Sequence, residues 1–378
     1  MNKTVRNIID QHAATQADST YLITPQTEQT MRYGELQQHA RELSQQLIAQ
    51  GIGKGEKVAM LLDNGYWSVA IMLGVMYSGA VIVPMNTVAG ESALNYALDH
   101  SDAQLLFVSP HYAKKYAQLI DNMLGRMAMI LVDNADFNPA ILNDHSTDIP
   151  QTLPDITPDD HAILIYTSGT TGRPKGVLLS HRNILAGGNN TATAHQLTQA
   201  DRGLCVLPLY HINAEIVSLV SSLLCGGSVV LPARFGVSAF WQDIVKYQCS
   251  WFSLVPTMVT YLLDHESREP IDNLTRDYIK QHVHFGRSAS SPLSPEMHRE
   301  FERKFSVSLI ETMGLTETAA QILSNPLPPG KIKYGSPGIA FGNEAKIMND
   351  HQQDCPVGVQ GELMIRGDNV MAGYYKNE

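Results

Sequence analysis

Residues 57–84 read KVAMLLDNGYWSVAIMLGVMYSGAVIVP, and this stretch indicates how the chain folds. Lys57–Leu62 is a continuous apolar run of strand length, and Ala80–Pro84 is a second one. The apolar residues between them, from about Tyr66 to Gly79, suit a buried helix rather than a bilayer span, because Ser, Gly and Pro interrupt the run. Two buried strands joined by a helix are typical of a parallel sheet that is covered on both faces.

The alternation of strands and helices continues along the chain and changes character beyond Pro326. Between Ile163 and Tyr247, strand-like runs again alternate with helical segments. Beyond Pro326 the segments are short and strand-like, without a helical period, which favours a small β subdomain. We therefore expect an α/β protein with two doubly wound α/β subdomains, helices lying on both sheet faces, at 1–160 and 161–326, and a small β-barrel-like subdomain at 327–378.

Composition and charge exclude several classes of protein. The chain has 378 residues, of which 27 are Lys or Arg and 37 are Asp or Glu, so its formal charge is −10. This acidic balance argues against nucleic-acid and anionic-membrane binders. The four cysteines lie at least twenty residues apart with no metal-ligand spacing, and the N-terminus lacks the apolar core of a secretory signal. We therefore expect a soluble, cytoplasmic protein with reduced thiols.

One loop carries a pattern that suits a polyphosphate. Residues 166–176 read YTSGTTGRPKG and lie between two predicted strands. Three glycines let backbone N–H groups approach a ligand, four hydroxyl side chains add hydrogen-bond donors, and Arg173 and Lys175 add positive charge. The loop does not match G-x-x-x-x-G-K-[ST], so it is not a Walker A loop. A flexible linker is the alternative, but the ordered strands predicted on both sides argue against it.

Residues 166–176 resemble the signature loop of the adenylate-forming superfamily, which includes acyl-CoA synthetases, nonribosomal adenylation domains and luciferases. Further segments are similar to family motifs in the expected order, and together they run through almost the whole chain. These segments are Gly79–Asn86, Leu207–Asn213 (LPLYHIN), Arg287–Leu293 (RSASSPL), Met313–Glu317 (MGLTE), Gly361–Leu363 and Gly373–Tyr375.

The resemblance implies an enzyme that activates a carboxylic acid with ATP. The acid attacks the α-phosphate, pyrophosphate leaves, and the acyl adenylate then passes to the thiol of coenzyme A or of carrier-protein phosphopantetheine. The catalytic residues would be Lys175, His211, Thr316 and Glu317, and Glu317 would bind Mg²⁺. The remaining ATP contacts implied by the family motifs are Thr167, Ser168, Gly169, Thr170, Thr171, Gly172, Ser290, Ser291, Pro292, Met313 and Gly314.

Two departures from the family pattern, together with the residues of the acyl pocket, bear on which nucleotide and which acid the enzyme would bind. Met313 stands where the family usually has an aromatic residue against adenine, and a thioether can still contact a ring. Ala289, Ser290 and Ser291 replace the common Gly-Ala-Ala, which narrows or polarises the pocket. By resemblance, the acid would be bound by a partly polar set of side chains: His211, Asn213, Ala214, Ser253, Ala289, Thr318 and Gln321.

The resemblance also implies a C-terminal lid domain, which carries a catalytic lysine and presents the thiol. That domain is not expected within these 378 residues, so we expect this chain alone to adenylate poorly. Segments such as Phe240-Trp241 and Ser324–Pro328 resemble the oxalate, carnitine and 4-coumarate CoA-ligase branches, which favours a CoA ligase for a small acid.

Two other interpretations stay open from the sequence. A stand-alone enzyme that loads an acyl carrier protein would share every motif present, and so would a truncated nucleotide-binding pseudoenzyme. Hydrolase and metalloprotease functions are excluded because G-x-S-x-G and H-E-x-x-H are both absent from the chain.

Overall fold

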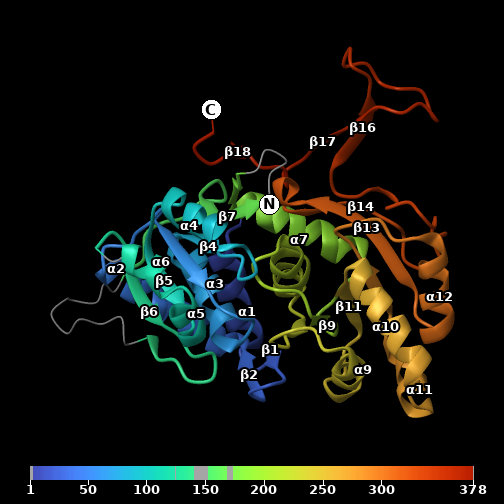
Figure 1. Cartoon of the computed structure of the whole chain (residues 1–378), viewed down its shortest axis with the longest axis horizontal. Coiled ribbons are helices and arrows are strands. Elements are labelled where there is room, and N and C mark those ends of the chain that lie inside the picture. Colours follow the sequence, from blue (N-terminus) through green and yellow to red (C-terminus); the bar gives the residue numbers. More distant parts are fainter. Residues whose placement is uncertain (1–2, 124, 140–151, 168–172, 378) are drawn as a thin grey trace.

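The computed structural model describes residues 3–123, 125–139, 152–167 and 173–377, and Figure 1 shows two α/β lobes side by side. The earlier part of the sequence, coloured blue to green, forms most of one lobe. Yellow and orange segments form most of the other. Each lobe is built on one twisted sheet, so the expected α/β fold class with helices on both sheet faces is confirmed.

The first lobe contains a seven-stranded sheet whose centre is parallel. Five neighbouring strands, β7, β4, β3, β5 and β6, run parallel to one another. At one edge, β8 pairs antiparallel with β7, and β18 pairs antiparallel with β8. The strands in spatial order are β18 (Gly373–Tyr374), β8 (Lys175–Ser180), β7 (His161–Thr167), β4 (Val81–Pro84), β3 (Lys57–Leu61), β5 (Ala103–Val108) and β6 (Ala128–Leu131).

The second lobe contains a nine-stranded sheet that is parallel from β13 to β1 and antiparallel at both edges. Its order is β15 (Ile339–Ala340), β14 (Ala320–Ser324), β13 (Leu309–Leu315), β12 (Phe285–Ser288), β11 (Trp251–Leu254), β9 (Arg202–Cys205), β10 (Ser228–Val230), β1 (Thr20–Thr24) and β2 (Gln29–Arg32).

Helices cover both sheets, and α3 (Tyr66–Ser78) lies between them. Every residue of α3 is buried, and the helix contacts β3 and β4 of one sheet and β1 and β2 of the other. The apolar run in the sequence is therefore explained by burial on all sides. The other helices are α1 (Val5–Gln16), α2 (Tyr33–Ala49), α4 (Glu91–His100), α5 (Pro110–Lys115), α6 (Ala117–Met123), α7 (His181–Ala194), η2 (Asn213–Val220), α8 (Ser221–Cys225), α9 (Val237–Lys246), α10 (Pro256–Arg268), α11 (Asn273–His282), α12 (Pro295–Phe305) and η3 (Thr316–Thr318).

Local sequence explains where the helix that positions the candidate site begins. Ser180 is the N-cap of α7: its hydroxyl accepts a bond from the Asn183 N–H, and the Asn183 side chain accepts one from the Ser180 N–H. This reciprocal capping satisfies backbone donors that a helix start leaves free. The segment from Asn213 is one of the helical segments expected between Ile163 and Tyr247, but its first part is a π-helix.

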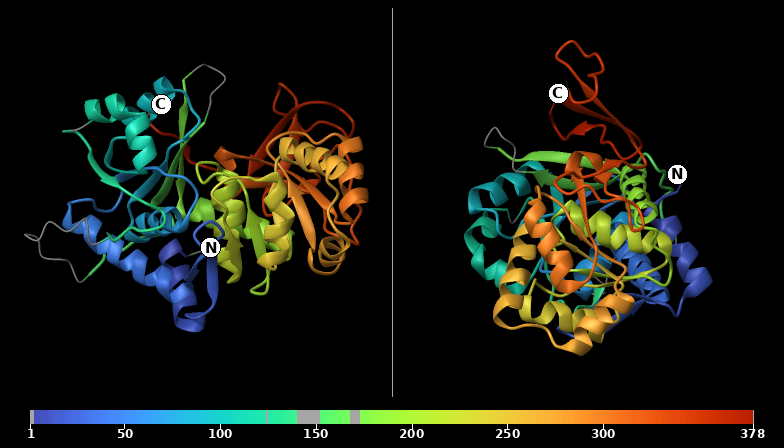
Figure 2. Two further views of the ribbon diagram at one scale, coloured as in Figure 1. Left: turned by 60° about the horizontal axis from the view of Figure 1, so that its bottom comes forward. Right: turned by 90° about the vertical axis from the view of Figure 1, so that its right-hand side faces the viewer.

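The small β part is a ladder of two strands. Strands β16 (Glu344–Met348) and β17 (Glu362–Arg366) pair antiparallel with each other, and they stand away from both lobes in Figure 1 and in the right-hand view of Figure 2. Two strands cannot close a barrel, so the expected barrel-like form is not seen in the described part of 327–378. The neighbouring strands β15 and β18 instead extend the two large sheets.

The strand pairing crosses the domain limits expected at 160 and 326. Strands β7 and β8 follow residue 160 but belong to the first lobe's sheet, and β1 and β2 near the N-terminus belong to the other lobe's sheet. The division into 1–160, 161–326 and 327–378 therefore stays a proposal about domains. No helix in the described ranges is both long enough and apolar enough to cross a membrane.

Candidate functional site

A cleft with a volume of ≈ 540 Å³ gathers residues from both lobes. It opens where β7 and β8 of the first sheet approach β13 and η2 of the second lobe. Its lining includes eight residues selected from the sequence: Thr167, Lys175, His211, Asn213, Ser290, Gly314, Thr316 and Glu317. Asn86, Ile165, Tyr166, Leu207, Tyr210, Ile212, Val255, Leu315 and Tyr374 also line it.

The polyphosphate loop begins and ends at a hairpin base that faces this cleft. In the β7–β8 ladder, Thr167 pairs with Lys175, so their backbones lie opposite each other at the base of the loop. Both residues line the cleft. The remaining loop residues named from the sequence, Ser168, Gly169, Thr170, Thr171 and Gly172, lie outside the described residues.

Glu317 lies on a short 3₁₀ turn that directly follows strand β13. The Thr318 hydroxyl fixes this turn, since it accepts from the Leu315 N–H at 3.1 Å and lies 3.1 Å from the Ala320 carbonyl oxygen. Ala319 and Ala320 after it have positive φ angles of 44° and 80°. Non-glycine residues held in this region concentrate at functional sites. Thr318 thus fixes the turn that carries Glu317, and its place in the acyl pocket stays a prediction.

Tyr374 links Glu317 to Lys175. Its hydroxyl donates to Glu317 Oε1 at 2.8 Å, and this bond raises the pKa of the tyrosine. Lys175 Nζ lies 4.9 Å from the centre of the same ring, within the range of a cation–π contact. A carboxylate, a phenol and an ammonium group therefore meet at one wall of the cleft. Sequence reasoning recognised the Gly373–Tyr375 segment by resemblance but gave Tyr374 no role at the site.

The segment before Tyr374 ties the turn of Glu317 to helix α7. Asn183 on α7 donates to the carbonyl oxygens of Asp368 and Val370, at 2.8 and 2.9 Å. Asn369 donates to the Thr318 carbonyl oxygen at 2.9 Å, and the Met371 N–H donates to that of Glu317 at 2.9 Å. Hydrogen bonds from two asparagine side chains and one backbone N–H to backbone carbonyl oxygens therefore hold the turn that carries Glu317.

His211 lies at the mouth of the cleft, in a turn that the first lobe holds. Asn64 donates to the Leu207 carbonyl oxygen and accepts from the Leu209 N–H, each at 3.0 Å. The imidazole is exposed at its edge, yet the surrounding protein desolvates it and lowers the pKa of His211. A neutral imidazole can approach an anionic carboxylate without becoming a fixed cation.

Three residues predicted for the acyl pocket form a buried polar cluster around Arg287. The Arg287 guanidinium donates to Asn213 Oδ1 at 3.0 Å and to Ser253 Oγ at 3.3 Å from Nη1, and to Gln321 Oε1 at 3.4 Å from Nη2. The structure thus brings three of the predicted pocket residues together around one arginine. The sequence placed Arg287 in the family segment Arg287–Leu293 but did not reveal this role. A charged residue inside an otherwise buried strand was the available signal.

The other predicted residues lie around the same site in different environments. Ser290 lines the cleft with a φ of 74°, whereas Ser291 and Pro292 are exposed beyond its lining. Met313 on β13 is half-buried outside the lining. Ala214 and Ala289 are buried and contribute no polar atom from their side chains.

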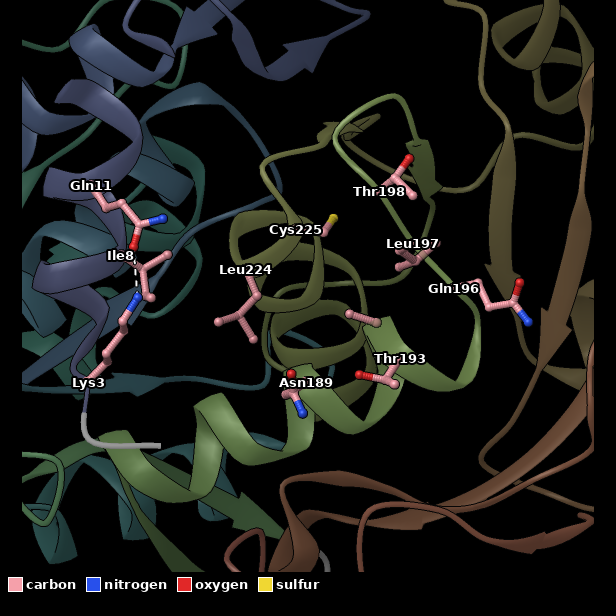
Figure 3. Close-up of a pocket in the computed structure, with 11 residues that line it drawn as sticks. Lys3, Ile8, Gln11, Asn189, Thr193, Gln196, Leu197, Thr198, Leu224 and Cys225 are labelled. Atoms are coloured by element: carbon pink, nitrogen blue, oxygen red, sulfur yellow. Dashed lines mark hydrogen bonds between the residues drawn. The ribbon is translucent and has the colours of Figure 1, made fainter. Parts of the chain in front are cut away.

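A second cavity lies away from these residues. Figure 3 shows it between α1 and α7, where Lys3 Nζ donates to Gln11 Oε1 at 2.8 Å. Its volume is ≈ 650 Å³, and its lining includes Asn189, Thr193 and Cys225. The lining carries no carboxylate and none of the residues selected from the sequence, so the 540 Å³ cleft is the candidate active site.

Gly187 on α7 is expected to be essential for the close packing beneath Glu317. A Cβ atom at this position would lie 1.9 Å from the Ala319 carbonyl oxygen, so Gly187→Ala must displace the turn. We expect a loss of about 1–3 kcal/mol in the free energy of unfolding, measured by urea denaturation. Gly53→Ala is the control, since no atom lies within 4 Å of the place that its new Cβ atom would take. Equal stability of the two variants would contradict this packing.

Comparison with known proteins decides the family. The family described as AMP-binding enzyme matches residues 9–375. The chain belongs to the AMP-binding enzyme family. It is 41% identical over 376 residues to the sulfoacetate–CoA ligase of Cupriavidus necator, covering 99% of this chain and 71% of that protein. It is 32% identical over 339 residues to the oxalate–CoA ligase of Arabidopsis thaliana, covering 86% of this chain and 63% of that protein.

Solved structures show the same fold. The apo structure of MatB from Rhodopseudomonas palustris matches 100% of this chain and 72% of its own, with a TM-score of 0.86 and 23% identity. A benzoate CoA ligase from Burkholderia xenovorans matches 99% of this chain and 73% of its own, with a TM-score of 0.87 and 21% identity. The membership of the adenylate-forming superfamily expected from the sequence is therefore confirmed.

Proposed function

We propose that this chain is the ATP- and acid-binding part of an AMP-forming CoA ligase for a small carboxylic acid. The observation that carries the proposal is the cleft itself, in which Lys175, Glu317 and His211 come from three separate family motifs and face one space. The similarity to relatives that are named as CoA ligases of two-carbon acids supports the acid class and the acceptor.

The residues divide the work of bringing a carboxylate to a polyphosphate. The two reactants repel each other, so positioning and charge neutralisation lower the barrier most. Lys175 and Thr167 at the hairpin base bind the phosphate oxygens and hold the departing pyrophosphate. Thr316 contacts the α-phosphate, and His211 orients the attacking carboxylate. Ser290 and Gly314, which also line the cleft, border the nucleotide.

The residues present fit a magnesium ion bound together with ATP. Magnesium is usually held by one or two carboxylates together with substrate phosphates. Glu317 supplies one carboxylate at the cleft wall, and no group of three or more acidic, His or Cys ligands occurs among the described residues. The ion supplies neutralisation of phosphate charge when bound. The Tyr374 hydroxyl donates a hydrogen bond to Glu317 Oε1, and this bond fixes the orientation of the carboxylate.

We infer the thiol acceptor from the relatives, and the cellular compartment from the cysteines of this chain. We favour coenzyme A over a carrier protein as the thiol donor, because the named relatives are CoA ligases. All four cysteines are free, which fits a reducing cytoplasm.

ATP–pyrophosphate exchange tests the proposal with the complete protein that contains this chain. We expect labelled pyrophosphate to enter ATP only when a suitable small acid is present, and we expect thioester formation when coenzyme A is added. Acetate, oxalate, malonate, sulfoacetate and benzoate form the panel. If no acid supports exchange although ATP binds, the proposed function is wrong.

A further inference from the structure

Arg287 is a buried cation at the centre of the polar cluster. Its side chain lies on β12 in the middle of the nine-stranded sheet, and the residue is 2% exposed. Its three described hydrogen-bond acceptors, Asn213, Ser253 and Gln321, are all neutral. Burying a charge without a counter-charge costs several kcal/mol, and proteins rarely retain such an arrangement without a reason.

No carboxylate within the described ranges neutralises this arginine. None lies within the 4.0 Å that defines an ion pair with it. Glu311 on the neighbouring β13 is one residue beyond the partner of Arg287 in the ladder, which puts its side chain on the opposite face of the sheet. Glu215 on η2 is buried as well, and burial raises its pKa well above the usual range, but neither of its carboxyl oxygens has a hydrogen-bond partner among the described residues, so it does not pair with Arg287. The desolvated guanidinium has its pKa lowered to about 9 and is still charged at neutral pH.

The cluster has hydrogen-bond donors left over and lacks acceptors. Arg287 Nε, Asn213 Nδ2 and Gln321 Nε2 are buried and have no hydrogen-bond partner among the residues that the structure describes. All three are nitrogen donors. Burial, and in second place the charge of Arg287, lowers the pKa of His195 to about 3, so this imidazole is neutral. A negatively charged group with several acceptor oxygens would accept hydrogen bonds from these donors and form an ion pair with Arg287.

The cluster connects directly to the cleft through Asn213. This residue lines the cleft and at the same time accepts from Arg287 and from Ser253. His211, two positions earlier, also lines the cleft, so one ligand in the cleft can contact both residues.

We propose that Arg287, together with Asn213 and Gln321, binds a second anionic group of the acid substrate, so that this enzyme selects short acids carrying a sulfonate or a second carboxylate. This inference rests on the proposed function and adds the substrate class to it. Pairing of the buried charge by the substrate predicts that a neutral acid is rejected, since it would leave the donors unsatisfied.

Matched acids test the inference in the complete enzyme. Sulfoacetate and methylsulfonylacetate have nearly the same shape, as have malonate and acetoacetate, but the second of each pair lacks the distal charge. We expect kcat/KM in pyrophosphate exchange to be at least about 100-fold higher for the charged acid of one or both pairs. Comparing the two pairs distinguishes a sulfonate from a carboxylate as the preferred distal group.

Arg287→Gln gives the second measurement. It should lower kcat/KM for the preferred dianion by about 100-fold while changing its neutral counterpart and the KM for ATP by less than about 3-fold. The control is Arg202→Gln, because Arg202 on β9 also donates hydrogen bonds to neutral partners, Ser228 Oγ and the Tyr247 carbonyl oxygen, outside the cleft.

An equal loss of kcat/KM for both acids of a pair, or a wild-type enzyme that does not distinguish the two acids, would overturn the inference and leave the proposed function standing. No exchange with any acid would overturn both. If Arg287→Gln does not fold, the wild-type preference alone decides.

Discussion

Glu317→Gln is expected to lower ATP–pyrophosphate exchange by about 100- to 1000-fold. The substitution removes a negative charge at the wall of the cleft and keeps the size of the side chain. The amide oxygen can still accept from the Tyr374 hydroxyl, which lies 2.8 Å from the carboxylate in the native protein, so the fold should be preserved. The dependence of exchange on magnesium concentration should shift to higher concentrations, because the protein's ligand to the metal–ATP complex is lost.

Glu302→Gln is the matched control for this prediction. Glu302 on α12 also accepts from a tyrosine hydroxyl, that of Tyr334, at 2.7 Å, and it lies outside the lining of the cleft. Exchange by the Glu302 variant should stay within about 3-fold of the wild type after correction for folded protein. If both variants lose the same fraction of activity, Glu317 acts through stability and not through the reaction.

Lys175→Met is expected to have the second largest effect, with exchange lowered by about 100-fold and a raised KM for ATP. The methionine keeps the length of the side chain and its contact with the Tyr374 ring, while the charge that faces the phosphates is removed. Lys57→Met is the control, because Lys57 Nζ lies 5.3 Å from the centre of the Tyr375 ring without lining the cleft. An unchanged KM for ATP in the Lys175 variant would show that this lysine does not contact the phosphates.

The fold class could be predicted from the sequence because buried parallel strands and a helix buried on all sides leave continuous apolar runs. The strand run at Lys57–Leu62 and the helix at about Tyr66–Gly79 are found at β3 (Lys57–Leu61) and α3 (Tyr66–Ser78). Sheet membership could not be predicted from such runs, because it depends on contacts between distant segments. Strands β1 and β10, for example, pair across some two hundred residues of sequence.

The candidate site was predictable where a motif is contiguous and hidden where it is not. Lys175, Thr316 and Glu317 lie in continuous signatures and line the cleft. The environment of Arg287 is assembled from η2, β11 and β14, so no local pattern reveals that its partners are all neutral. The turn role of Thr318 could not be predicted, because a hydroxyl that fixes a turn and one that faces a substrate have the same identity in a sequence.

Oxygen transfer from the acid to AMP tests the central claim most directly. The complete enzyme is given ATP, coenzyme A and an active acid labelled with ¹⁸O in its carboxylate, and the released AMP is analysed by mass spectrometry. Attack of the carboxylate on the α-phosphate predicts one labelled oxygen in AMP, because the bridging oxygen leaves with the nucleotide when the thiol attacks. Label in inorganic phosphate or pyrophosphate, with none in AMP, would contradict adenylate formation at this cleft.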